Sequence, residues 1–330
     1  MTVPAESRNA RLGRFHLGRD RRRTLYAIIA AVLLFAVGEL VHPGFAGLGS
    51  VEAILTVASF VGLVAAGQTF VVLIGGIDLS VPWVLNGAAI LLVTSSLGED
   101  GRALYAVLLT LGMGAGVGVL NGLGVAFLAV PAVVMTLAMN GVMEGLTLGL
   151  SGGLTCGACA SYAPPIVQRA VHESIFGAPA ELYLWLFVII LVSFVLGRTR
   201  FGRHTYAIGN NARASYLAGI SVRFTTVALY ALSGLFSALA GILLVGFGGQ
   251  ASLGMGTPYL FQSIAAVVIG GVYILGGRGS YLGAAAGAAS LTALVSVLLA
   301  LNMPDYGRSI IYGIVILALL LLYGREEGES

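Results

Sequence analysis

The sequence predicts an all-α polytopic membrane protein with about ten transmembrane helices. Hydrophobic residues make up 58% of the chain and charged residues only 9%, whereas ordinary soluble domains carry about 25% charged residues. No charged residue lies between Arg223 and Arg278, or between Arg102 and Glu144. Since about 20 apolar residues cross the ~30 Å hydrocarbon core of a bilayer, each of these runs is long enough to cross it more than once.

Turn residues and charges divide the apolar sequence into the expected spans. Pro43 and Gly44 end the first span, and Pro131, which interrupts a helix because it has no amide proton, separates the fourth from the fifth. The expected spans are Thr24–Val41, Val51–Ile74, Pro82–Leu97, Ala103–Ala129, Val133–Leu150, Leu182–Gly197, Phe224–Gly246, Tyr259–Leu275, Tyr281–Leu301 and Ser309–Tyr323. The 48 glycines of the chain favour close packing of these helices.

The distribution of arginine predicts that both termini are cytoplasmic. All 17 basic residues are arginines. With the N-terminus inside, ten spans place 14 arginines on cytoplasmic segments and 3 on outer segments, as the positive-inside rule requires. We therefore expect a basic cytoplasmic tail, residues 1–23, followed by a transmembrane domain, residues 24–330. The seven arginines of the tail are interpreted as a topology signal and not as a nucleic-acid-binding arm.

Several kinds of chemistry find no support in the sequence. A phosphate-binding loop of the form G-x-x-x-x-G-K-[ST] needs a lysine, and the chain has none. The four histidines are scattered outside the expected spans, so we expect no metal site and no catalytic site. Cys156 and Cys159 lie in an expected outer loop, where two sulfurs cannot complete a four-ligand zinc site. They form either a disulfide or two free thiols.

Asp78 is one of few ionisable residues near the expected spans. It follows Gly75 and Gly76 at the inner end of the second span. One interpretation is functional, because acids at membrane depth are rare. The interpretation that we favour is structural: either Asp78 or Ser80 caps the helix that begins near Val81.

Four further polar residues lie within expected spans, and they are candidates for a solute path. Glu144 lies well inside the fifth span, with Asn140 one helical turn before it, and Asn86 and Asn121 lie in other spans. Together they could line a hydrated path for a hydroxyl-rich solute. The alternative, that they form hydrogen bonds that hold helices together, stays open for each of them.

The most distinctive polar element is a basic loop at about residues 198–223. Asn210 or Asn211 can cap a short helix from Ala212 to Ala218, and Gly219 can end it. A short helix on the cytoplasmic face between two spans would suit docking to a partner. The alternative is a solvated loop that only satisfies the positive-inside rule.

Four parts of the chain resemble, in order, the motifs of the ribose-type ABC importer permeases. Residues 67–80, GQTFVVLIGGIDLS, resemble the family signature that contains G-G-I-D-L-S, and residues 121–131, NGLGVAFLAVP, followed by 136–141, resemble its N-G…P segment. Residues 199–220 resemble the coupling region, and residues 265–280 resemble the G-G…G-G-x-G-S element. The motif residues are Gly75, Gly76, Asp78, Ser80, Gly270, Gly271, Gly276 and Gly277.

This resemblance implies a permease subunit of the bacterial inner membrane that imports a pentose or hexose. It implies three protein partners: a second permease copy, identical or similar, a periplasmic solute-binding protein, and a cytoplasmic ABC ATPase. ATP would be bound by the ATPase, and this chain would bind no cofactor. The expected ATPase-coupling residues are Arg203, Gly209, Asn211, Ala212, Arg213, Ala214 and Gly219.

Two departures from the family pattern concern coupling and solute. Ala212 and Arg213 stand where the family often has an acidic residue at the start of the coupling helix, and Glu144 stands where relatives carry a basic or amide residue. Alternative functions are an importer of another small polar solute and, from another class, a stand-alone ion-coupled carrier. A membrane enzyme would need acid–base groups clustered at a membrane face, which the sequence does not offer.

Overall fold

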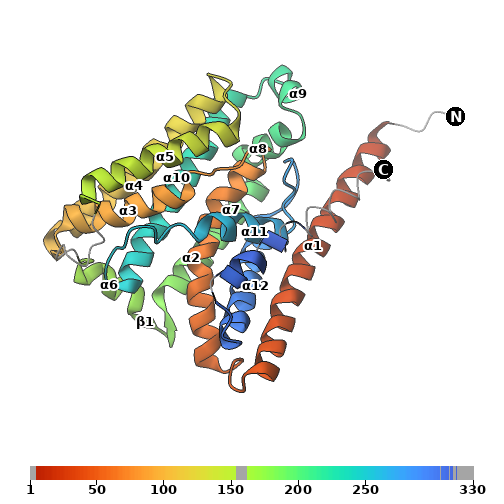
Figure 1. Ribbon diagram of the computed structural model, residues 1–330. Helices are drawn as coiled ribbons and strands as arrows, with labels where there is room; N and C mark the ends of the chain where they lie inside the picture. The colour runs from red at the N-terminus through yellow and green to blue at the C-terminus, as the bar shows by residue number, and fades with distance from the viewer. Residues whose placement is uncertain (1–4, 154–161, 305, 312, 315–316, 318–330) are drawn as a thin grey trace.

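The computed structural model describes residues 5–153, 162–304, 306–311, 313–314 and 317. Almost all regular structure in this part of the chain is helical (Figure 1). The helices are α1 (Ala5–Val41), α2 (Leu48–Val72), α3 (Val81–Ser96), α4 (Asp100–Ala126), α5 (Ala132–Ser151), α6 (Pro165–His172), α7 (Ala180–Arg198), α8 (Arg200–Asn210), α9 (Ala212–Leu217), α10 (Val222–Gly248), α11 (Tyr259–Ile269) and α12 (Tyr281–Ala300), and the strands are β1 (Ser174–Ile175) and β2 (Ala178–Pro179).

Seven of the described helices are long and apolar enough to cross a membrane: α1, α2, α4, α5, α7, α10 and α12. This confirms the all-α polytopic membrane fold. The helix α1 begins at Ala5, so the basic residues expected to form a separate tail continue into the first span as one helix.

Two expected spans are helices too short to cross the hydrocarbon core by themselves, and only the eighth is shorter than predicted. At 1.5 Å per residue, the 16 residues of α3 cover about 24 Å and the 11 residues of α11 about 16 Å, less than the ~30 Å hydrocarbon core. The eighth span was expected to run to Leu275, but α11 ends at Ile269 because Gly271 adopts a positive φ of 80°. The last expected span, Ser309–Tyr323, lies mostly outside the described residues.

The core of the bundle is built on α2, α10 and α12. More than half of the apolar window of each helix is buried inside the protein, compared with 17% for α1 and α5. Glycines allow this close contact: Gly67 of α2 packs on the backbone of Ser233, and Gly118 of α4 packs on the carbonyl of Tyr230. Since membrane helices associate mainly through packing, these contacts hold α10 between α2 and α4.

The two ends of the bundle carry different structures (Figure 1). At one end lie α6 and the β1–β2 hairpin, which occupy the expected outer loop between Ser151 and Glu181. Asp100 joins α4 to this end, because its carboxylate accepts a hydrogen bond from the Ile166 amide (2.7 Å) and pairs with Arg169 (3.0 Å). Cys156 and Cys159 lie outside the described residues. At the other end lie α8 and α9, close to the turn that connects α4 to α5.

Candidate functional site

Asp78 lies at the centre of a buried polar cluster. Its side chain is 1% exposed, and it sits in the loop between α2 and α3. The carboxylate oxygen Oδ1 accepts hydrogen bonds from the Ser80 amide (3.0 Å) and the Ser80 hydroxyl (2.6 Å), and Oδ2 accepts one from the Ser233 hydroxyl of α10 (2.7 Å). Asn121 of α4 donates to the Ser80 hydroxyl (2.9 Å). The cluster therefore joins the loop to α4 and α10.

The expected capping role of these residues was wrong. Ser80 occupies the N-cap position of α3, but its side chain accepts no hydrogen bond from the helix. A capping side chain bonds the amide of the second or third helical residue, and the second residue here is Pro82, which has no amide proton. Asp78 instead bonds the amide and hydroxyl of Ser80 and a hydroxyl on another helix.

The cluster includes residues that sequence analysis did not single out. Ser233 is one of several hydroxyl residues on the apolar helix α10 and lies 155 positions away from Asp78, so no local pattern indicates that the two meet. Tyr230, one turn before Ser233, is fully buried, and its hydroxyl lies next to Gly76, where a side chain would clash with it.

The four candidate path residues lie in two different environments. Asn121 and Asn86 are buried, at 0% and 1% exposed. Asn121 belongs to the Asp78 cluster, whereas the side-chain amide of Asn86 has no hydrogen-bond partner among the described residues. Asn140 and Glu144 are half-buried on α5. Of these residues only Asn121 is joined to the cluster by a hydrogen bond of the described structure.

Two loops that contain motif glycines lie against each other and contact α8. The first loop follows α2 and contains Gly75 and Gly76, and the second loop follows α11 and contains Gly276 and Gly277. The Gly277 amide donates to the Leu73 carbonyl (2.8 Å), and Gly75 faces the carbonyl of Leu275. Gly209 of α8 packs directly on both Leu73 and Gly277, which leaves no room for a side chain. The coupling region therefore rests on both loops.

Two side chains of α8 add hydrogen bonds to the second loop. The Tyr206 hydroxyl donates to the Gly279 carbonyl (2.8 Å), and the Asn210 amide donates to the Gly277 carbonyl (3.3 Å). The helix itself was missed, because this stretch was expected to be loop. Its start carries a capping signal: the Thr199 hydroxyl accepts from the Gly202 amide (3.2 Å).

The short helix predicted in the basic loop is confirmed. Asn211, one of the two candidate caps, accepts a hydrogen bond from the Ala214 amide (2.9 Å) and begins α9. Gly219 follows the helix with a φ of +83°, which glycine adopts at little cost. Five of the expected coupling residues are exposed. Arg203 lies on α8, and the others lie on α9 or directly after it: Ala212, Arg213, Ala214 and Gly219.

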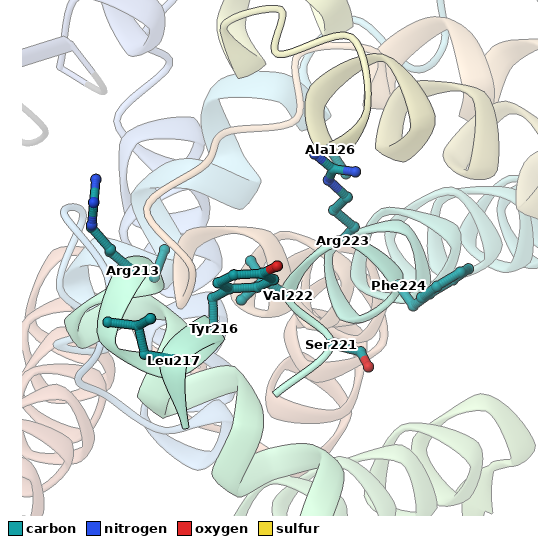
Figure 2. A pocket seen from close by; sticks show the side chains of 9 residues that line it. Ala126, Arg213, Tyr216, Leu217, Ser221, Val222, Arg223 and Phe224 are labelled. Carbon is teal, nitrogen blue, oxygen red and sulfur yellow. The ribbon is translucent and has the colours of Figure 1, made fainter. Parts of the chain in front are cut away.

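An open pocket of about 780 Å³ lies between α9 and the start of α10. Figure 2 shows Arg213, Tyr216 and Leu217 on α9, and Arg223 and Phe224 at the start of α10. The Arg223 guanidinium lies over the Phe127 ring, 5.5 Å from its centroid. In the part of the chain that the structure describes, neither arginine of the pocket forms an ion pair.

The fold is a multi-pass helical bundle that carries a short exposed helix, α9, at one end. The chain matches, over residues 50–320, the family described as the branched-chain amino acid transport system / permease component, and it belongs to that family. It is a multi-pass protein of the bacterial inner membrane.

Individual relatives agree with the resemblance seen in the motifs. The chain is 32% identical over 307 residues to the autoinducer 2 import system permease protein LsrC of Escherichia coli O9:H4 (strain HS), covering 93% of this chain and 88% of the relative. It is 32% identical over 303 residues to the ribose import permease protein RbsC of Escherichia coli (strain K12), covering 91% and 94%. The expected membership among ribose-type ABC importer permeases is confirmed.

Proposed function

We propose that this chain is the permease subunit of an ABC importer that carries a monosaccharide, a pentose or hexose, into the cell. The observation that carries the proposal is the similarity to a ribose import permease along nearly the whole of both chains. A periplasmic binding protein delivers the sugar, and a separate cytoplasmic ATPase supplies the energy. The chain holds no ATPase site and binds no cofactor. Two permease copies, identical or similar, enclose the path.

We place both termini in the cytoplasm and count about ten spans, including the two short helices and the last expected span. The distribution of arginine supports this orientation. The arginines at the α8–α9 end are Arg198, Arg200, Arg203, Arg213 and Arg223, whereas Asp100 and Glu99 lie at the α6 end. Cytoplasmic segments of membrane proteins carry this excess of positive charge.

The ATPase docks on α9 and on the pocket beside it. Apolar side chains at the pocket are exposed, with Tyr216 at 70% and Leu217 at 78%, and exposed apolar clusters mark interaction sites. Arg213 and Arg223 are exposed cations that can pair with carboxylates of the partner. This reverses the polarity of the family pattern, in which the permease often supplies the acid. We therefore expect an acidic segment on the matching ATPase surface.

Co-purification from detergent-solubilised native membranes tests the function. The expected result is recovery of a P-loop ATPase with the chain, and ATP-dependent uptake of a sugar when both are reconstituted with the binding protein. Recovery of the chain alone, in a form that transports without ATP, would contradict the proposal and favour an ion-coupled carrier.

A charge reversal tests the docking surface. Arg223→Glu should weaken ATPase co-purification about ten-fold or more, because like charges across an interface cost several kcal/mol. Arg200→Glu is the matched control, since Arg200 is exposed at the same end but does not line the pocket. Equal loss in both variants would mean that overall charge, and not this pocket, attracts the ATPase.

A further inference from the structure

The segment between α10 and α11 enters the bundle from its outer end. At residue 250 it is still at that end: Gln250 pairs with Tyr162, and the Gly249 carbonyl accepts from the Ala163 amide (2.9 Å). Both of these partners lie next to α6. Six residues later, Gly256 packs directly on the carbonyl of Pro82, at the first turn of α3.

The helix α3 shows how far this contact lies from the outer end of the bundle. Its far end, near Ser96, lies at the outer end of the bundle, because Gly98 faces the carbonyl of Tyr162 at 3.5 Å. Pro82 is 14 residues before Ser96, which is about 21 Å along a helix. The contact of Gly256 with Pro82 therefore places the segment well inside the bundle, far from its outer end, and α11 continues from there.

The eighth span, expected to begin at Tyr259, is thus the short helix α11, and a non-helical segment, residues 249–258, enters the bundle before it. The Met255 amide donates to the Ser252 carbonyl (3.3 Å), and the Thr257 amide donates to the Gly254 carbonyl (2.9 Å). These residues therefore form turns and not a helix. Non-helical backbone at membrane depth occurs only where it is buried in protein or lines a water-filled cavity. Ser252, Thr257 and Pro258 are exposed on this chain, so this side of the segment faces an aqueous space or the second permease copy, and not lipid.

A groove of about 460 Å³ lies along this segment, between α2, α10 and α11. That volume falls within the ~300–1,000 Å³ typical of small-molecule sites. Its lining includes the polar side chains of Gln250, Ser252 and Gln262, together with Phe247, Met255 and Tyr259. No charged residue lines it. Amide and hydroxyl groups can each donate and accept hydrogen bonds, as neutral hydroxyl groups require, and the aromatic rings offer flat apolar faces.

We propose that this groove is the outer part of the solute path and binds a neutral, polyhydroxylated solute. Gln250, Ser252 and Gln262 bond its hydroxyl groups, and the aromatic rings contact its C–H face. This inference rests on the proposed function and names where its solute first meets the permease. Broken helices of this kind frame the substrate sites of many transporters. The site differs from the expected path residues, which lie on α3, α4 and α5.

Thiol labelling tests whether the groove is open to water. In a background of Cys156→Ser and Cys159→Ser, Ser252→Cys is introduced into the assembled importer in sealed vesicles. A membrane-impermeant maleimide added outside should label Ser252→Cys but not Phe261→Cys, because the thiolate that reacts forms only in water and Phe261 is an exposed apolar residue outside the groove. D-ribose or D-glucose delivered by the binding protein should slow the labelling. Absence of labelling at Ser252→Cys in the assembled importer would overturn the proposal.

Uptake kinetics test the hydrogen bonds. Gln262→Leu should lower sugar uptake about ten-fold, the loss expected for one or two hydrogen bonds, with ATPase co-purification unchanged. Thr94→Val is the control, since the Thr94 hydroxyl bonds its own helix (2.7 Å) outside the groove. Unchanged uptake in Gln262→Leu and in Gln250→Leu would refute the binding role. If the unmodified importer fails to move any sugar with ATP, the proposed function fails, whereas labelling still reports whether the groove is aqueous.

Discussion

The loops that follow α2 and α11 end their helices in the same way but differ in what they do next. After α2, the Gly75 amide bonds the Val72 carbonyl (2.9 Å), and after α11 the Gly271 amide bonds the Val268 carbonyl (2.9 Å). Both glycines have a positive φ, 78° and 80°, which is the usual left-handed end of a helix. A serine precedes the next helix in both cases.

The difference lies in the side chains that the two loops carry. The first loop turns Asp78 into the bundle, where hydroxyl groups from Ser80 and Ser233 satisfy it. The second loop carries the half-buried Arg278, which lies over the Tyr273 ring at 6.0 Å, and offers its carbonyls to α8. Both loops contact α8, but the first also ties α4 and α10 to the bundle through Asp78, whereas the second adds the side-chain hydrogen bonds to α8. The same way of ending a helix thus precedes a buried polar cluster in one place and a platform for α8 in the other.

The largest expected loss of stability follows from a substitution in the first loop, at Asp78. Asp78→Ala should lower the free energy of unfolding by about 3 kcal/mol, because three hydrogen bonds are lost and their buried donors are left without an acceptor. Denaturation in detergent, followed by circular dichroism, measures this. Glu99→Ala is the control, since Glu99 pairs with Arg102 at the surface and such pairs contribute little. Equal effects would show that the buried cluster does not brace the bundle.

The second prediction concerns the contact of Gly209 of α8 with the two loops. Gly209→Ala should cost about 2 kcal/mol through overpacking, because its side chain would collide with the Leu73 carbonyl. ATP hydrolysis should no longer respond to the loaded binding protein. Gly197→Ala is the control, since nothing lies within 4 Å of a side chain there, and removal of a helical glycine should be neutral or favourable. Retained coupling in Gly209→Ala would separate α8 from the transport mechanism.

Local signals in the sequence predicted part of this arrangement. Asn211 and Gly219 are a cap and a helix end, and both act within a few residues of their position, so α9 was predicted correctly. The span boundaries near Pro131 and Gly75 were found for the same reason. Asp78 was misinterpreted because its decisive partner, Ser233, comes from a distant helix that no single-chain pattern links to it.

The segment before the eighth span shows a second limit. Residues 249–269 are uniformly apolar or weakly polar, and hydropathy reports composition but not backbone conformation. Gly249, Gly254, Gly256 and Pro258 do separate residues 249–258 from α11, and the expected span began at Tyr259, as α11 does. No signal in the sequence, however, placed this non-helical segment inside the bundle. The helix α8 was missed for the opposite reason, because Arg200 and Arg203 made an amphipathic surface helix resemble a solvated loop.

A smaller effect is expected at the contact between α8 and the second loop. Tyr206→Phe removes the hydrogen bond to the Gly279 carbonyl (2.8 Å) and should cost about 1 kcal/mol, measured by the same denaturation assay. Tyr216→Phe, at an exposed tyrosine of α9, should leave stability unchanged. If ATPase co-purification also falls in Tyr206→Phe, then the second loop supports docking as well as stability.

The smallest effect distinguishes the two serines that precede α3 and α12. Ser280 is a true cap, since its hydroxyl accepts from the Gly283 amide (3.2 Å). At a cap, glycine costs only a few tenths of a kcal/mol, so Ser280→Gly should be nearly neutral. Ser80→Gly should cost clearly more, because the Ser80 hydroxyl bonds Asp78 and Asn121. Thermal unfolding of both variants measures the difference. Similar melting shifts would mean that the two serines are equivalent helix caps, and the contrast between the two loops would then rest on Asp78 alone.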